Sequence, residues 1–558
     1  APDVMSEFVE NCKASDDISI VERCLLHMDV TIMDFDSILS LLKKSSMYSA
    51  LIHVYTQGLN DFLSPLQILF DACFDAADQT SSTMMGKARL HTLQKIGYKI
   101  ILYLRHCFTN KSFPTGVEIK PNDRVHTIRP ELLRLLIRKD FQRPQPSSTK
   151  GDIGIRVKQF PYLSLLMMLD TKALLDTFSF IFDDNDVLFA DNSEIKESLD
   201  YWQNINEDDT FSSEQYFICP DKMDIIRRIA HVLENNNDLN SLDASNYFHD
   251  FLAKYLLKGT IRAPPNVVCN VILRLSSSAA QEDVIKLLQV LPRNSYNRNE
   301  VLKVVEDHYI SRAALILHKG GVQDSLHEIG IDPQLCAIHF TSAIDCYLRD
   351  SDPGFRREVF EYVKNECIGG NASILARNQQ STGVKTVHDL LRNALCKKLP
   401  DLINLDPVPC AQLVAEIYVE ELEQILTSLE DGEDEIALFK FLKAVISGDL
   451  VRVDAVAGPV LLANMTIDHH QKYLELMAKF HPDMVYHYLR NSDNYRVEEC
   501  LKLCQDYEIA DASAYLLERM GSVSSALQLM LQTLEGRLMS LKRAVRSVSV
   551  SPLDNRGR

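Results

Sequence analysis

Residues 506–534 read DYEIADASAYLLERMGSVSSALQLMLQTL, two helical patterns separated by a single glycine, Gly521. After Gly521, apolar residues recur at intervals of three and four, the spacing that predicts one buried face of a helix. These residues are Val523, Ala526, Leu527, Met530, Leu531 and Leu534. Before Gly521, Ala512, Tyr515 and Leu516 form a second apolar stripe. Because Gly521 lies where a residue with positive φ would close the first helix, we predict a tight antiparallel hairpin.

The hairpin needs neighbours, because each of its helices is short and has an apolar face to bury. Similar patterns precede it, with apolar residues at helical spacing in 473–480 and again in 497–504. Helices of about ten to fourteen residues with short connections, recurring from 466 to 535, are typical of a helical solenoid. Within the hairpin we assign a structural repeat motif. Its residues are Tyr515, Leu516, Gly521, Ala526 and Leu527.

Composition extends this prediction to the whole chain of 558 residues. Gly and Pro number 20 each, which is below their average usage and is expected of a chain built mainly of helices. We therefore predict the all-α class, with an extended α-solenoid of antiparallel helical hairpins. The predicted parts are an N-terminal part at 1–145, a loop at 146–160, a middle part at 161–375, a C-terminal part with the repeat at 376–540 and a flexible tail at 541–558.

The charge of the chain disfavours one class of partner. A formal net charge of −18 argues against nucleic acid, because phosphate binding requires clustered lysine and arginine. One segment is basic: RPELLRLLIRKDFQRPQP begins at Arg129 and contains Arg134, Arg138, Lys139 and Arg143. Two interpretations stay open for it, contact with an anionic membrane or acidic partner, and an ordinary solenoid helix with a basic outer face.

Motifs for catalysis are missing from the sequence. We find no P-loop, no G-x-S-x-G elbow, no H-E-x-x-H motif and no C-x-x-C pair, and we expect neither an enzyme nor a cofactor. Cys500 and Cys504 lie one helical turn apart downstream of His469 and His470, so a zinc site is conceivable. Structural zinc usually takes ligand pairs on turns, however, whereas these cysteines occupy positions that the helix must bury. We therefore predict no metal site and interpret the cysteines as buried, reduced thiols.

The sequence also predicts the cellular compartment of the protein. The longest apolar runs fall far short of the roughly 18 residues that a membrane-spanning helix needs. The first residues, APDVMSEFVE, lack the features of a signal peptide and lack an initiator Met. We expect a cytoplasmic protein, and we interpret the sequence as a fragment.

Residues 473–531, from YLELMAKF to SSALQLML, resemble the clathrin heavy-chain repeat as it occurs in vacuolar protein sorting subunits. Three upstream stretches make the resemblance more specific. They are YSALIHVYTQGLNDFLSPLQILF at 48–70, FPYLSLLMMLDTKALLDTFSFIFDD at 160–184 and SAIDCYLRDSDPGFRREVFEYV at 342–363. Together they are similar to the subunit family particular to the CORVET tethering complex of early endosomes. Members of that family also carry a β-propeller and a RING-type zinc module, and no residues of this chain resemble either.

The resemblance implies a non-enzymatic scaffold of a membrane tether, acting as a Rab effector subunit in endosome fusion and vesicle-mediated transport to the lysosome or vacuole. The implied partners are the class C vacuolar protein sorting core subunits and an early-endosomal Rab GTPase. The implied location is cytoplasmic and peripheral on the early endosome membrane. A solenoid scaffold of another coat or tether stays open as the alternative, whether a HOPS-type subunit, coatomer or a nuclear-pore scaffold. The net charge disfavours a HEAT-like nucleic-acid adaptor.

Overall fold

The computed structural model describes most of the chain as helix. The described residues are Glu7, 18–27, 35–78, 86–120, 122–139, 159–189, 218–236, 242–278, 280–327, 333–367, 382–432 and 434–549. Within these ranges there is no β-strand, only two isolated bridges between single residues. The prediction of an all-α solenoid is confirmed.

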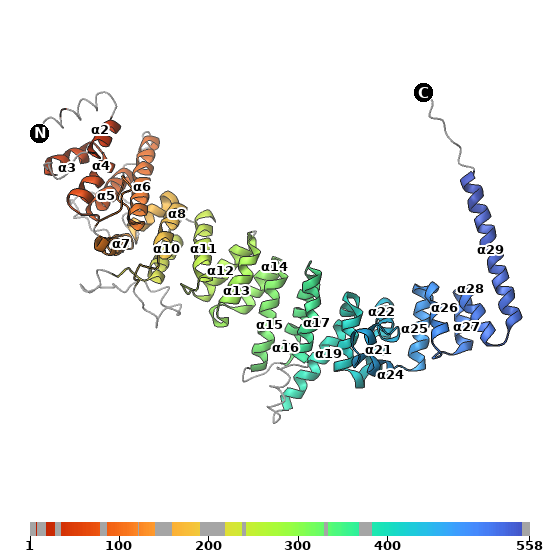
Figure 1. Ribbon diagram of the computed structural model, residues 1–558. Helices are drawn as coiled ribbons and strands as arrows, with labels where there is room; N and C mark the ends of the chain where they lie inside the picture. Colours follow the sequence, from red (N-terminus) through yellow and green to blue (C-terminus); the bar gives the residue numbers. More distant parts are fainter. Residues whose placement is uncertain are drawn as a thin grey trace, which may run out of the picture. The chain divides into compact units, whose positions relative to one another are not determined.

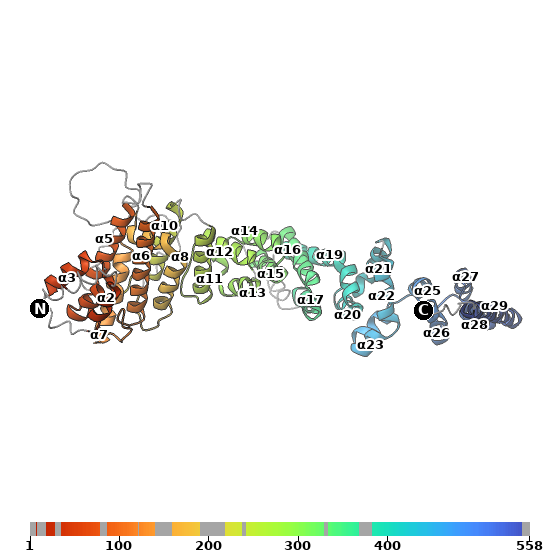
Figure 2. The ribbon, with the colours of Figure 1, turned by 90° about the horizontal axis from the view of Figure 1, so that it is seen from above.

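Two compact units make up the chain, Ala1–His308 and Tyr309–Arg558. The helices of the first unit are α2 Ile18–Leu25, α3 Phe35–Lys44, α4 Tyr48–His53, η2 Val54–Gly58, α5 Ser64–Asp78, α6 Gly86–Phe108, α7 Asn122–Leu136, α8 Pro161–Phe182, α10 Lys222–Asn235, α11 Leu242–Leu257, α12 Pro265–Ser277, α13 Gln281–Val290, η6 Arg293–Ser295 and α14 Arg298–Asp307. Successive helices pack on one another, α5 on α6, α6 on α8, α8 on α11 and α11 on α12. Figure 2 shows α6, α8, α11 and α12 side by side in that order.

The second unit continues the same construction. Its helices are α15 Ser311–His327, α16 Pro333–Arg349, α17 Pro353–Cys367, α19 Thr382–Leu405, α20 Pro407–Ile417, η7 Val419–Glu421, α21 Leu422–Asp431, α22 Glu435–Ile446, α23 Asp449–Val453, α24 Ala457–Ala463, α25 Ile467–Phe480, α26 Pro482–Asn491, α27 Val497–Asp506, α28 Ala510–Arg519 and α29 Val523–Ser549. Near the C-terminal end, α25 contacts α26 and α27, while α28 contacts α26, α27 and α29. Each helix thus packs on its next neighbours along the chain, which is the contact pattern of a solenoid (Figure 1).

Local sequence explains where many helices begin. Pro161, Pro265, Pro407 and Pro482 each open a helix, where the missing N–H of proline costs nothing. Helix α25 begins instead with a capping box, in which Oγ1 of Thr466 accepts from the backbone N–H of His469 and the His469 ring accepts from the N–H of Thr466.

Aromatic side chains fill much of the space between helices. In the first unit, the ring of Tyr162 from α8 meets the Phe70 ring of α5 edge-on at 4.7 Å between centroids. In the second unit, Phe439 of α22 stacks on Tyr473 of α25 at 5.7 Å, and Tyr473 meets Tyr488 of α26 edge-on at 5.3 Å. The Phe70–Tyr162 and Phe439–Tyr473 contacts join helices that are not consecutive, so they stabilise the stack, whereas Tyr473–Tyr488 holds together the consecutive helices α25 and α26.

The predicted tail needs a correction. Residues 541–549, which we expected to begin a flexible tail, belong to α29, a helix of 27 residues. No glycine or proline follows Gly536 before Pro552, so the sequence holds no signal that would end the helix at residue 540. The loop predicted at 146–160 falls largely outside the described residues. The predicted boundaries of the parts at 1–145, 161–375 and 376–540 stay predictions. The structure divides the chain instead into two compact units, Ala1–His308 and Tyr309–Arg558.

Among the described helices, none has both the length and the apolar composition that crossing a bilayer requires.

Candidate functional site

The turn of the C-terminal hairpin has the predicted geometry. Gly521 has a φ of +83°, and the space around its Cα is open. The N–H of Ser522 donates to the carbonyl of Leu517, and the N–H of Gly521 donates to the carbonyl of Glu518, both at 2.9 Å. This pair of hydrogen bonds is a Schellman motif, which requires a left-handed residue at the glycine position.

The motif residues before the turn lie in the packed interior of the stack. Leu516 and Ala512 are buried in α28. The half-buried Tyr515 places its ring edge-on against Tyr486 of α26, at 5.8 Å between centroids. These contacts join α28 to the helix two positions earlier in the chain.

After the turn, the predicted burial is wrong for most of the apolar stripe. Of the stripe residues Val523, Ala526, Leu527, Met530, Leu531 and Leu534, only Ala526 is buried. Leu527, which we assigned to the repeat motif, is 63% exposed. The face of α29 with lower exposure contains Ala526, Leu529 and Thr533. Helical spacing identified residues that share a face but did not establish that this face packs against α28.

The exposed residues continue along the helix. We define the α29 stripe as Leu527, Leu531, Leu534, Leu538, Leu541 and Val545. Its side chains are between 54% and 65% exposed. The charged side chains of α29 are mainly basic, with Arg537, Lys542, Arg543 and Arg546 against a single carboxylate, Glu535. Sequence reasoning found the first half of this stripe but assigned it to the core.

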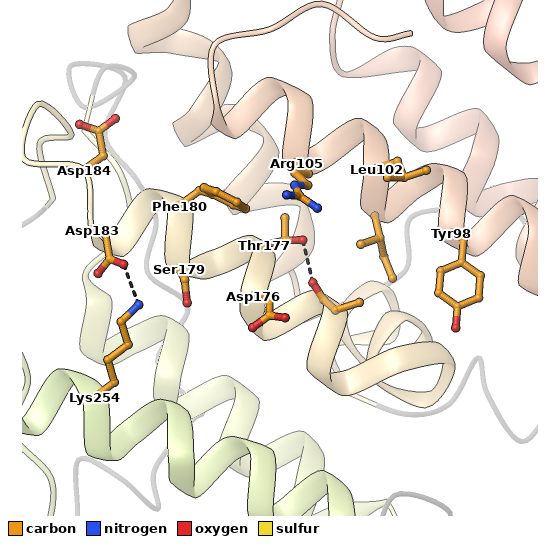
Figure 3. A pocket seen from close by; sticks show the side chains of 12 residues that line it. Tyr98, Leu102, Arg105, Asp176, Thr177, Ser179, Phe180, Asp183, Asp184 and Lys254 are labelled. Atoms are coloured by element: carbon orange, nitrogen blue, oxygen red, sulfur yellow. Dashed lines mark hydrogen bonds and ion pairs between the residues drawn. The ribbon is translucent and has the colours of Figure 1, made fainter. Parts of the chain in front are cut away.

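A second surface lies in the first unit, where α6 and α8 border a groove of about 670 Å³. Figure 3 shows Tyr98, Leu102 and Arg105 on one side of it and Asp176 and Phe180 on the other. The guanidinium of Arg105 lies over the Phe180 ring, 5.1 Å from its centroid. Sequence reasoning missed this groove, because the residues that line it come from distant segments.

Charged groups at one end of the groove are held by ion pairs. The carboxylate of Asp183 accepts from Lys254 and from Lys258, each at 2.7 Å. Burial alone would raise the pKa of Asp183, but the hydrogen bonds from Lys254 and Lys258 lower it below its ordinary value. The lining of the groove therefore combines apolar and aromatic side chains of α6 and α8 with an ion-paired end.

The basic segment is partly buried, so Arg129 does not belong to the basic outer face that was one of the two interpretations left open. Arg129 is 6% exposed, pairs with Asp184 at 2.9 Å and donates to the carbonyl of Phe108 at 2.9 Å. Arg134 donates to the carbonyl of Ile218 at 2.7 Å. Burial of a guanidinium is tolerated where it is paired and hydrogen-bonded, as it is here. Arg143 lies outside the described residues.

A related ion network in α10 was not anticipated. The carboxylate of Asp224 pairs with Arg227 at 2.7 Å and with Arg228 at 2.9 Å, and all three residues are buried. Arg228 also donates to the carbonyl of Ile137, which joins α10 to the chain after α7. The spacing of three and four residues is visible in the sequence, but the burial of the network is not. Its contacts are structural.

The residues of the conceivable zinc site have other roles. Burial raises the pKa of the Cys500 thiol to about 11 and that of Cys504 to about 12, which disfavours the thiolates that zinc requires. The ring of His470 is hydrogen-bonded to the Tyr488 hydroxyl at 2.7 Å, and His469 caps α25. In the part of the chain that the structure describes, no cluster of three or more metal-ligating side chains occurs.

Comparisons with known proteins match both ends of the chain. Residues 1–182 match the family profile described as Vps8 central TPR, and residues 460–550 match the one described as Vps41 TPR-like region. Vacuolar protein sorting-associated protein 8 homologs from mouse and human are each 24% identical over 97% of this chain. A vacuolar protein sorting-associated protein 41 homolog from Arabidopsis thaliana is 21% identical over 49% of it, or 24% of its own length. The chain spans about a third of the length of the mouse and human relatives, 33% in each case.

Proposed function

We propose that this chain, a helical solenoid similar to the mouse and human Vps8 homologs, is a non-enzymatic scaffold segment of a CORVET-type membrane-tethering complex. The observation that carries the proposal is the similarity to the mouse and human Vps8 homologs over 97% of the chain. A stack of helical hairpins supports a scaffold role, because within each unit it presents many exposed helix surfaces on one packed array.

The proposed process is endosome fusion and vesicle-mediated transport to the lysosome or vacuole. The proposed partners are the class C vacuolar protein sorting core subunits, and an early-endosomal Rab GTPase for which the whole protein would be an effector. The proposed location is cytoplasmic and peripheral on the early endosome membrane. Similarity to both Vps8 and Vps41 homologs supports membership of a vacuolar protein sorting assembly.

Proximity labelling tests this proposal. The chain is fused to a labelling enzyme and expressed in cells, and a second cell line expresses the enzyme alone at the same level. We expect the fusion to enrich class C core subunits and to lie on early endosomes, and the enzyme alone to do neither. Enrichment of coatomer or nuclear-pore subunits, with the fusion at the Golgi or the nuclear rim, would contradict it.

The Rab effector role has its own test. One set of beads carries the early-endosomal Rab GTPase loaded with a non-hydrolysable GTP analogue, and a second set carries it loaded with GDP. The whole protein, for which the effector role is proposed, is passed over both sets. An effector binds the GTP form preferentially, because the γ-phosphate orders the switch segments that effectors recognise. Equal retention on the two kinds of bead would remove the effector role and leave the scaffold role in place.

A HOPS-type subunit is the second candidate, because residues 460–550 match the Vps41 profile. The same labelling experiment separates the two candidates. A fusion that lies on the lysosome or vacuole membrane, and labels HOPS-specific subunits more strongly than CORVET-specific ones, would favour the second candidate.

A further inference from the structure

The α29 stripe has the spacing of a coiled-coil seam. From Leu527 to Val545 its residues follow one another by alternating steps of four and three. Residues spaced in this way recur every 3.5 positions on average, the repeat that keeps one seam facing a partner helix along its length. In heptad notation, Leu531, Leu538 and Val545 occupy position a, and the other stripe residues occupy position d.

Within the described residues, nothing covers this seam. Its side chains are more than half exposed from end to end, as the range of 54% to 65% shows. The opposite side of α29 is the one that packs, since Ala526 is buried and Leu529 and Thr533 are partly covered. The neighbouring helix α28 has 10 residues and α29 has 27, so α29 runs well beyond it (Figure 1). A continuous row of exposed leucines of this kind marks an interaction surface.

The charges beside the seam disfavour a second copy of this chain as the partner. Positions e and g flank a coiled-coil seam and set partner choice, and here they include Glu535 and Lys542 at e and Arg537 at g. In a parallel pair, Arg537 of one copy would face Lys542 of the other. In an antiparallel pair with the seams aligned, Arg537 would meet Arg537 and Glu535 would meet Glu535. Both arrangements place like charges together, which costs stability.

The charge of α29 indicates what kind of helix would fit instead. Of the three charged side chains at its e and g positions, two are basic, Arg537 and Lys542, and one is a carboxylate, Glu535, in a chain whose net charge is −18. We propose that α29 forms a two-stranded coiled coil with an acidic helix of another protein. That helix has aliphatic residues at its a and d positions and carboxylates facing Arg537 and Lys542. This proposal goes beyond the tethering function and does not depend on it.

Two synthetic peptides of four heptads test the proposal against the purified chain. Both have isoleucine at a and leucine at d, and they differ only at e and g, which are all glutamate in the acidic peptide and all lysine in the basic one. We expect the acidic peptide to bind at least tenfold more tightly in calorimetry. Because the flanking pairs are exposed, we expect the difference to shrink as salt is added.

Substitutions in α29 identify the surface that binds. The double variant Leu534→Asp and Leu538→Asp should weaken binding of the acidic peptide at least tenfold. The control is Met539→Asp, at a residue that is 64% exposed but lies off the seam, and it should change binding less than twofold. The double variant Arg537→Glu and Lys542→Glu should reverse the preference, so that the basic peptide binds more tightly. All these residues are exposed, so the thermal unfolding transition should not move, and circular dichroism checks this.

Several results would overturn the proposal. Equal binding of both peptides would mean general adhesion to exposed leucines, and binding of neither would mean that α29 is not a coiled-coil strand. A dimer in sedimentation that Leu538→Asp converts to a monomer would make a second copy the occupant. A longer chain, extended at its C-terminus, provides another test. If it no longer binds the acidic peptide and the amides of α29 become protected from exchange, the residues that follow α29 are the occupant of the seam.

Discussion

At the scale of single residues, Leu516 and Leu527 show how differently two members of one predicted motif can be placed. Leu516 is fully buried in α28, whereas Leu527 is 63% exposed on α29. Both are leucines at helical spacing on either side of Gly521. The free energy that each contributes to folding therefore depends on its surroundings, not on its type.

Truncation of these two leucines should separate the two environments. Leu516→Ala should reduce the free energy of unfolding by about 2 to 5 kcal/mol, because it leaves a cavity in the packed stack. Leu527→Ala should change it by less than about 0.5 kcal/mol, as expected of an exposed side chain. Urea unfolding followed by circular dichroism measures both. A large loss for Leu527→Ala would mean that α29 packs through its stripe.

Two glycines of the same hairpin give a second prediction at this scale. Gly521→Ala should destabilise the chain by about 1 kcal/mol, because φ is +83° there and a Cβ makes that conformation unfavourable. Gly536→Ala is the matched control, since Gly536 lies inside α29 and an added Cβ would meet no atom within 4 Å. It should stabilise the helix by about 0.5 to 1 kcal/mol. Melting temperatures that shift in the same direction for both variants would contradict the assigned backbone geometry.

At the scale of elements, α15 and α16 pack through a pair of buried histidines. The Nδ1 atoms of His318 and His339 lie 3.0 Å apart, and both side chains are buried. Burial lowers the pKa of His318 to about 4, although the nearby Asp345 acts in the opposite direction. The close approach of the two helices is possible because Gly321 has no side chain, and an added Cβ would lie 2.6 Å from the His339 ring.

Because the pKa of the buried His318 is lowered, we predict that the free energy of unfolding decreases in mild acid. With a pKa of about 4 in the folded state and 6.5 when unfolded, His318 binds its proton more tightly in the unfolded chain. Stability should therefore fall as the pH drops from about 6.5 towards 4, by about 2 kcal/mol between pH 7 and pH 5. His318→Gln should remove most of this dependence in urea titrations at the two pH values. An unchanged pH dependence in the variant would assign it to other groups.

At the scale of the whole molecule, the helices form two compact units in which each helix contacts mainly its near neighbours along the chain. In such arrays stability is close to a sum of local contributions. Damage at one repeat should then loosen the adjacent repeats and leave distant ones unchanged.

Hydrogen exchange tests this locality. In the Leu516→Ala variant, amide exchange should accelerate in α25 to α29 and stay unchanged in the helices of residues 1–308. The reason is that α28 contacts α26, α27 and α29 in the second unit. Leu527→Ala is the control and should leave exchange unchanged in α25 to α28. Uniform acceleration along the chain would show that the array unfolds as one cooperative unit.

The sequence by itself determined the helical class, the hairpin and the turn at Gly521. These depend on interactions among residues three or four positions apart and on the backbone freedom of one glycine, so they can be deduced from local spacing. The similarity to vacuolar protein sorting subunits was also visible in short stretches of sequence. The helix start at Pro482 was predictable for the same local reason.

Only the tertiary structure decided which surfaces are buried and which are available to partners. The stripe on α29 was placed wrongly from sequence, as core. The burial of Arg129 contradicts the basic outer face, which was one of the two interpretations left open for its segment. The groove between α6 and α8 draws its lining from residues as far apart as Tyr98 and Lys254. Periodicity identifies which side chains share a face of a helix. Whether that face is covered depends on neighbours that the local spacing does not encode.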